Sequence, residues 1–241
     1  MENKVCLVVG AGDALGGAIA RRFAREGFVT CVVRRTADKL QPLVDAIGEG
    51  GGKAFAYPCD ARREEEVVAL FEKIEREHGP IEVCVFNIGG NIRFSILEYS
   101  AKKYFKVWEM GCFAGFLTGR EAAKRMVSRG RGTILFTGAT ASLRGGSGFA
   151  GFSGAKAGLR MLAQSMAREL QSQNIHVAHV VIDGPIDTEF VRGSFPDMVK
   201  SRPADGLLAP EDIAENYWSL HVQKRSAWTH ELDVRPWVEP W

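Results

Sequence analysis

The stretch VCLVVGAGDALGGAIARRFAREG, Val5–Gly27, decides the fold because it joins a buried strand to a helix through a glycine-rich turn. It begins with a continuous apolar run, as expected of a strand that is covered on both faces. The following segment, Ala14–Arg25, carries Leu15, Ile19 and Phe23 at four-residue spacing. That spacing predicts a helix with one apolar face. The stretch is therefore the first β-α half of a β-α-β unit.

The same alternation continues along the chain. Apolar runs predict strands at Val5–Gly10, Gly27–Arg34, Lys53–Pro58, Ile81–Phe86, Thr133–Thr137 and Ile175–Ile182. Helical patterns lie between them at Arg62–Glu77, Ala101–Ser128 (one long helix or two abutting ones) and Phe152–Gln171, and Pro210 opens a last helix. Repeated β-α-β units with right-handed crossovers build a parallel sheet covered by helices. We therefore predict an α/β fold, a single doubly wound Rossmann-type domain over residues 1–241.

Composition excludes several classes of function. The chain is 46% hydrophobic and 25% charged with a net charge of +2, so we expect no nucleic-acid or membrane partner. The N-terminal residues carry no signal-peptide or lipidation pattern, which suits a cytoplasmic protein. No cysteine or histidine spacing indicates a metal site. We interpret the scattered cysteines as buried small hydrophobic residues: Cys6, Cys31, Cys59, Cys84 and Cys112.

The turn after the first strand is a candidate phosphate cradle. Glycines allow a tight turn and close backbone approach, and the following helix offers free N–H groups to a pyrophosphate. The spacing departs from GxGxxG because Leu15 stands where the third glycine belongs. A plain strand-to-helix turn is the alternative, but its place at the start of a β-α-β chain favours a dinucleotide site. The candidate residues are Gly10, Gly12, Asp13, Ala14, Leu15 and Gly16.

The end of the second strand bears on the choice of cofactor. An acidic residue there would hold the adenosine ribose hydroxyls, whereas this chain has Arg34 and Arg35. Two guanidinium groups suit a 2′-phosphate through charge-assisted hydrogen bonds. A solvated basic loop is the alternative, and the Asp13 carboxylate opposes a nearby phosphate. On position we favour NADP(H) over NAD(H).

Further candidates follow the third and fourth strands, at the sheet edge where ligands bind in such folds. They are Asp60 and Ala61, and then Asn87, Ile88 and Gly89. For Asp60 a helix N-cap is an equally simple interpretation.

Taken together, these motifs resemble the short-chain dehydrogenase/reductase family over nearly the whole length. The turn is similar to TGxxxGxG with Val9 for Thr and Ala14 for the middle Gly, and Asn87–Gly89 resembles the second half of NNAG. The resemblance implies that Asp60 contacts the adenine and that a PGxxxT-like segment meets the nicotinamide. That segment has Asp183 in place of its proline, followed by Gly184, Pro185, Ile186, Asp187 and Thr188. It also implies a seven-stranded sheet, with Glu231–Val234 as the last strand.

The proton-transfer residues of the family are missing. Lys156 matches the lysine of YxxxK, but Phe152 stands at the tyrosine, Ala139 at the serine and Gly111 at the helix asparagine. A tyrosine seven residues before the lysine is also missing, because that position is Phe149. The resemblance leaves Lys156 as the one candidate catalytic residue, holding the nicotinamide ribose; a helix-surface charge is the alternative. Removing one oxyanion donor costs on the order of 100–1,000-fold in rate, so an ordinary ketone reductase is disfavoured.

Three functions remain open. We favour an NADP(H)-dependent oxidoreductase with atypical proton handling that acts on an unidentified small molecule, such as one with an activated C=C bond. The second is a non-catalytic NADP(H)-binding protein that serves as a sensor or a regulatory or scaffold subunit, and the third is a scaffold without cofactor. In the first, the substrate brings its own acid or a pocket residue supplies a donor. The candidates for that donor are Arg93, Thr140, Ser142, Arg144 and Asp183.

Two segments near the C-terminus have other predicted roles. The glycine- and proline-containing segment 187–208 is expected to be a mobile substrate lid. The tail 228–241 holds Trp228, Trp237 and Trp241, which we expect to cover this chain's own core or to pack on a neighbouring subunit. The family resemblance implies a homodimer or homotetramer, built partly on the helix that starts near Phe152.

Overall fold

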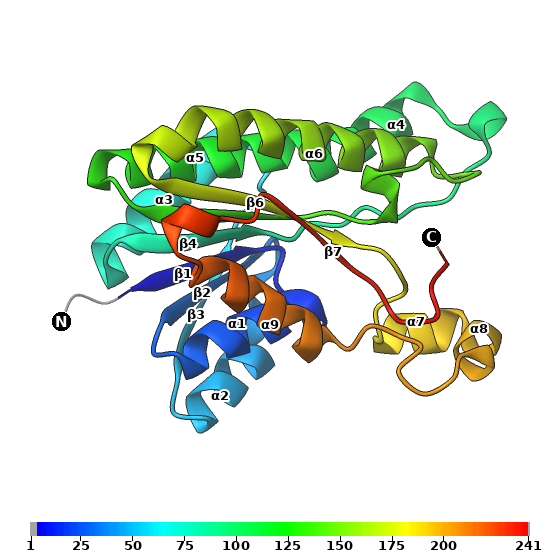
Figure 1. The fold of residues 1–241 in the computed structure, drawn as a ribbon, viewed down its shortest axis with the longest axis horizontal. Helices are drawn as coiled ribbons and strands as arrows, with labels where there is room; N and C mark the ends of the chain where they lie inside the picture. Colours follow the sequence, from blue (N-terminus) through cyan, green and yellow to red (C-terminus); the bar gives the residue numbers. More distant parts are fainter. Residues whose placement is uncertain (1–3, 241) are drawn as a thin grey trace.

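The computed structural model describes residues 4–240, and its centre is one sheet of seven parallel strands (Figure 1). The strands are β1 Val5–Val9, β2 Val29–Arg34, β3 Lys53–Pro58, β4 Ile81–Phe86, β5 Gly132–Thr137, β6 Ile175–Ile182 and β7 Glu231–Val234. Their order is β3-β2-β1-β4-β5-β6-β7, which changes direction between β1 and β4. A crevice at the carboxyl ends of the strands is expected at such a switch point. The predicted fold class and the parallel sheet are confirmed.

Helices cover both faces of this sheet (Figure 1). They are α1 Leu15–Arg25, α2 Gln41–Glu49, α3 Glu64–His78, α4 Ala101–Trp108, α5 Ala114–Arg129, α6 Ala150–Leu170, α7 Glu189–Ser194, α8 Pro196–Ser201 and α9 Pro210–His221. Helices α3, α5 and α6 enclose one core, and α1, α2 and α9 enclose the other. In β1, Val5, Leu7 and Val9 face the first core, whereas Cys6 and Val8 face the second. Burial on both faces explains why β1 and the other central strands read as continuous apolar runs.

Three details depart from or refine the sequence analysis. Helix α2 was not predicted, and it places Leu43 and Ile47 in the core. The predicted helix from Ala101 is continuous, but a π-helical turn at Glu109–Phe113 joins α4 to α5. The predicted lid, 187–208, contains the two short helices α7 and α8. These helices lie at one end of the molecule, close to the C-terminal tail (Figure 1).

The tryptophans of the tail have different surroundings. Trp228 stacks on His176 of the same chain, with ring centroids 4.8 Å apart. The Trp237 ring is 72% exposed, although its Nε1 donates a hydrogen bond to the Ala204 carbonyl at 3.1 Å. Trp241 lies outside the described residues. Packing on this chain therefore accounts for Trp228 and leaves the Trp237 ring open to solvent.

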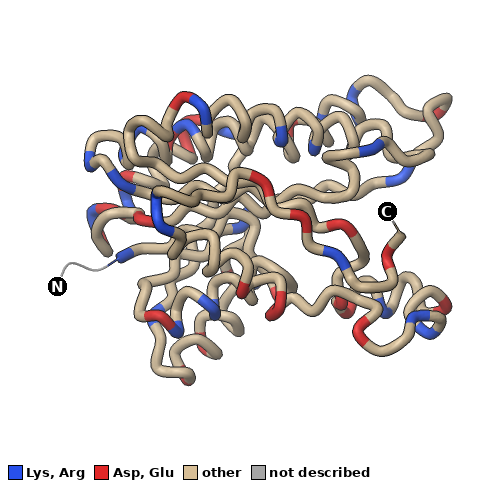
Figure 2. Tube along the Cα trace, viewed as in Figure 1, with Lys and Arg blue, Asp and Glu red and all other residues tan. Residues whose placement is uncertain are grey.

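Positions of Lys and Arg are interspersed with positions of Asp and Glu along the chain (Figure 2). No helix in the described range is long and apolar enough to cross a membrane. Residues 4–240 also contain no group of three His, Cys, Asp or Glu side chains arranged to hold a metal ion. Four cysteines are buried and Cys112 is partly buried, and all five are free thiols. The interpretation of the first four cysteines as buried core residues is confirmed.

Candidate functional site: a dinucleotide-sized cleft

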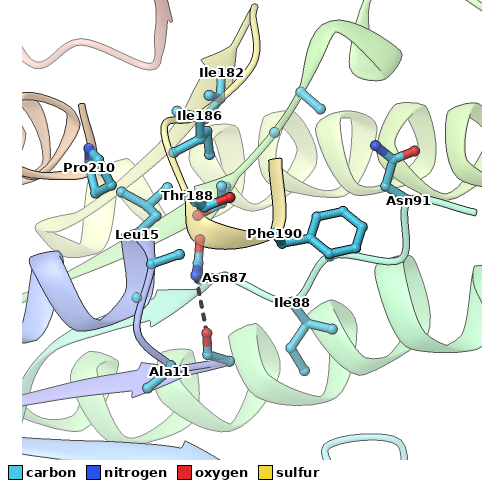
Figure 3. A pocket seen from close by; sticks show the side chains of 18 of the residues that line it. Ala11, Leu15, Asn87, Ile88, Asn91, Ile182, Ile186, Thr188, Phe190 and Pro210 are labelled. Atoms are coloured by element: carbon cyan, nitrogen blue, oxygen red, sulfur yellow. Dashed lines mark hydrogen bonds between the residues drawn. The ribbon is translucent and has the colours of Figure 1, made fainter. Parts of the chain in front are cut away.

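A long cleft with a volume of about 1610 Å³ follows the carboxyl ends of the strands. Figure 3 shows Leu15, Asn87 and Thr188, which come from three different segments around it. Every residue that the sequence places at a cofactor lines this cleft: Gly10, Gly12, Asp13, Ala14, Leu15, Gly16, Arg34, Arg35, Asp60, Ala61, Asn87, Ile88, Gly89, Lys156, Gly184, Pro185, Ile186 and Thr188. Pockets for small ligands are usually about 300–1,000 Å³. This cleft therefore has room for a dinucleotide together with a second molecule.

The glycine turn packs so closely on its neighbours that Gly10 and Gly16 leave no room for a side chain. A Cβ at Gly10 would lie 2.8 Å from the Asn87 carbonyl, and one at Gly16 would lie 2.7 Å from the Gly10 oxygen. The Asn87 amide fixes the same turn by donating to the Gly10 carbonyl at 3.1 Å (Figure 3). A Cβ at Gly12, by contrast, would have no atom within 4 Å. The turn is thus tightly packed at Gly10 and Gly16 and open at Gly12.

The N-terminus of α1 offers hydrogen-bond donors to this space. The N-cap residue Ala14 provides no side-chain cap, and the first turn contains no acidic residue. Within the described chain, the backbone N–H groups of Leu15 and Gly16 have no backbone acceptor. Unpaired N–H groups and the helix dipole together favour an anion here. The donor set fits a pyrophosphate.

The part of the cleft beside the end of β2 is basic. Arg34 and Arg35 line it with Lys39 and Arg62, two residues that the sequence analysis did not single out. Arg62 is engaged by Asp60, whose Oδ1 accepts from the Arg62 Nε at 2.8 Å. These hydrogen bonds lower the pKa of the Asp60 carboxyl. The N-cap interpretation of Asp60 is wrong, because α3 is capped at Arg63.

Lys156 projects from α6 into the interior and is only 2% exposed. Its Nζ donates to the carbonyls of Thr137 at 2.7 Å and Ile88 at 3.1 Å. An ammonium has three N–H donors, and the third finds no acceptor among the residues described. Burial lowers the pKa of Lys156 from 10.5 to about 8. The interpretation of Lys156 as a helix-surface charge is wrong: it is a buried cation on the cleft wall.

The sequence and this geometry match one family of known proteins. A family model described as short chain dehydrogenase matches residues 4–198. The chain belongs to the short-chain dehydrogenase family.

Several relatives cover most of the chain. A 3-oxoacyl acyl-carrier-protein reductase from Bos taurus is 30% identical over 82% of this chain and 82% of its own. A 2,3-dihydro-2,3-dihydroxybenzoate dehydrogenase from Bacillus subtilis is 26% identical over 89% of this chain and 87% of its own.

Solved structures agree with the fold. A short-chain dehydrogenase from Rhodopseudomonas palustris has 47% identity and a TM-score of 0.85, covering 98% of this chain and 100% of its own. A metagenomic short-chain oxidoreductase in complex with NADP shares the fold at 24% identity, with a TM-score of 0.83 over 98% of both chains.

Positions that match the dehydrogenase proton relay are filled by groups without an exchangeable proton. Phe152 and Ala139 both line the cleft. The Lys156 Nζ lies 6.0 Å from the centroid of the Phe152 ring. Gly111 lies in the π-helical turn, and a Cβ there would be 3.0 Å from the Ala155 Cβ. Close packing of the π-helical turn on α6 therefore accounts for a small residue at position 111.

Most of the candidate replacement donors are engaged elsewhere. The Thr140 hydroxyl donates to Asp183 at 2.6 Å. The Arg93 guanidinium lies 5.9 Å from the Phe149 ring centroid, and Arg93 does not line the cleft. Arg144 does line the cleft. Two cleft residues that the sequence analysis missed as donors are Ser153 and Asn91, and the Ser153 Oγ has no partner within the described chain.

Ser142 belongs to a separate buried network. Its Oγ accepts from the Ala139 N–H at 3.1 Å and contacts the His179 Nε2 at 3.4 Å. The His179 Nδ1 contacts Glu231 at 3.1 Å, and Glu231 holds Arg160 through two hydrogen bonds of 2.6 Å. The order resembles a Ser-His-acid triad, but Ser142 does not line the cleft. Burial also lowers the pKa of His179 to about 4. This network joins the sheet to α6 and is not a nucleophilic site.

Proposed function

We propose that this dehydrogenase family member is an NADP(H)-dependent oxidoreductase with atypical proton handling. One observation carries the proposal: Lys156 is a buried cation with a free N–H on the wall of a dinucleotide-sized cleft. Keeping an ammonium out of water without a carboxylate partner is costly. A bound group that accepts its third hydrogen bond would offset that cost. The hydroxyls of a nicotinamide ribose are such acceptors.

Residues along the cleft fit the other parts of the same cofactor. The free N–H groups at the start of α1 would hold the pyrophosphate. Arg34 and Arg35 would hold a 2′-phosphate through charge-assisted hydrogen bonds. When bound, the nicotinamide would supply or accept a hydride.

The missing hydroxyls restrict the kind of acceptor. A ketone reduced in this cleft would become an alkoxide, and neither Phe152 nor Ala139 can protonate it or donate a hydrogen bond to it. A C=C bond conjugated to a carbonyl avoids this problem. Hydride addition at the β-carbon leaves an enolate, and water can then protonate the α-carbon. We therefore propose as the substrate an activated alkene, or a dicarbonyl whose enol form brings its own acidic proton.

A turnover screen tests this function. NADPH consumption is followed with a panel of enones and dicarbonyls, first for the wild type and then for Lys156→Ala. We expect at least one substrate, with turnover abolished in Lys156→Ala and retained in Lys200→Ala, an exposed control. If no compound is reduced, the protein does not have the proposed activity.

The substitutions at Phe152 and Ala139 favour a second candidate, a non-catalytic NADP(H)-binding sensor or regulatory subunit. Both side chains line an otherwise complete cleft. Restoring the hydroxyls with Phe152→Tyr and Ala139→Ser separates the two candidates. The regulatory role is supported if the wild type binds NADPH but reduces no compound, and the double variant reduces ketones.

A further inference from the structure

We infer that Arg144 is an anion-binding residue of the substrate site, and that the substrate carries a carboxylate next to an apolar body. The inference rests on the proposed function, because it takes the part of the cleft lined by Phe149, Phe152 and Phe190 as the substrate site. Arg144 follows β5 in the loop that leads to α6, and it lines the cleft.

A buried carboxylate holds the Arg144 guanidinium in place. Asp183 is fully buried, and both of its oxygens accept from the Arg144 Nη2 at 3.1 Å. The Thr140 hydroxyl and the Arg235 Nη2, 3.0 Å away, contact the same carboxylate from other sides. A buried carboxylate is kept only where it is well paired. Asp183 therefore fixes the direction of a charged side chain at the cleft wall.

The rest of the guanidinium is open. The Arg144 side chain is 48% exposed, and no residue in the described range accepts a hydrogen bond from its Nε or Nη1. An arginine that is anchored at one nitrogen keeps its other N–H groups in a fixed fork, which matches a carboxylate. By contrast, Arg192, which also lines the cleft, is already paired through two nitrogens with Asp187, at 2.6 Å each.

The apolar side chains that line the same cleft indicate the remainder of the ligand. Met110, Phe149, Phe152 and Phe190 line the cleft, and Figure 3 shows the Phe190 side chain projecting into it from α7. Two acidic side chains of the segment after β6 also line the cleft: Asp187, which Arg192 neutralises, and the exposed Glu189. An acid with an aryl or alkyl body satisfies both the aromatic wall and the guanidinium.

Matched acid and amide probes test the inference by binding. Pairs such as 3-benzoylpropanoate and its primary amide, with aryl or alkyl bodies, are titrated calorimetrically into NADP⁺-loaded protein. For the wild type we expect the acid to bind about 10- to 100-fold more tightly than its amide, since hydrogen bonds between charged groups are the strong ones. Arg144→Gln should bind both equally, and Arg192→Gln should keep the preference for the acid.

Three results would overturn the inference. Either no acid in the set binds the wild type, or the wild type binds acid and amide equally, or Arg144→Gln still binds the acid more tightly than the amide. NADP⁺ titrations of both variants, run first, should match the wild type because neither residue belongs to the proposed cofactor set. If NADP⁺ does not bind at all, the proposed function fails. The probe pairs are then titrated into the protein alone, because the Asp183–Arg144 contact is formed without cofactor.

Discussion

Replacing Lys156 with methionine should change how the stability of the protein depends on pH. The Lys156 ammonium is buried, and burial lowers its pKa from 10.5 to about 8. Between about pH 8 and 10.5 the unfolded chain therefore binds more protons than the folded chain. Stability rises with pH wherever the unfolded state binds more protons. The wild type should gain stability across this window relative to Lys156→Met, which has no amine at this position.

The size of this effect follows from the pKa. One pKa unit corresponds to about 1.4 kcal/mol, so the buried charge costs the folded state about 3 kcal/mol near neutral pH. Between about pH 7 and about pH 9.5 the wild type should recover about 2 kcal/mol of it. The variant also loses the hydrogen bonds to the Ile88 and Thr137 carbonyls, but that loss does not change with pH over this range.

Urea unfolding of both proteins at the two pH values measures the difference. Other groups that titrate in this range are common to the two proteins and cancel in the comparison. Lys200→Met, at an exposed position, controls for the loss of one lysine. If the free energies of unfolding of the wild type and Lys156→Met run parallel from pH 7 to 9.5, the Lys156 charge is not desolvated, and our argument for a bound partner fails.

Two further substitutions test the packing around the site. Gly111→Asn should lower the free energy of unfolding by about 1–3 kcal/mol, because its Cβ would press on the Ala155 methyl group. Gly145→Asn is the control, since a Cβ at Gly145 would meet open space, and it should lower the free energy of unfolding less. Equal effects of the two substitutions would refute the packing argument. Glu231→Ala should cost about 1–3 kcal/mol by leaving the buried His179 without its acidic partner. Thermal unfolding measures this, and an unchanged midpoint would mean that the buried network does not stabilise the fold.

The strands could be predicted closely because burial on both faces produces continuous apolar runs. Ile81–Phe86 and Ile175–Ile182 match the observed strands residue for residue. So does Lys53–Pro58, although only Ala54 and Tyr57 of this edge strand are buried. Helix α2 was missed because only Leu43 and Ile47 mark its buried face, and glycines follow it closely. A helix with two buried positions leaves little periodic signal.

The residues that line the cleft could be predicted from the sequence, but the contacts between side chains around it could not. Glycine turns and strand ends converge at one edge of a parallel sheet, so their positions follow from the topology. The contact between Arg144 and Asp183 joins residues 39 positions apart, and that between His179 and Glu231 joins residues 52 apart. Neither spacing carries a local pattern, because such contacts depend on how loops and strand ends meet after folding.

The most direct test of the central claim is a calorimetric titration of the purified wild type with NADPH and, separately, with NADH. Arg34 and Arg35 line the cleft where we propose that the adenosine binds. Charge-assisted hydrogen bonds to a 2′-phosphate should make NADPH bind at least about 10-fold more tightly than NADH. Equal affinities would contradict the role of the two arginines. Failure of both cofactors to bind would contradict the account of the cleft and of Lys156.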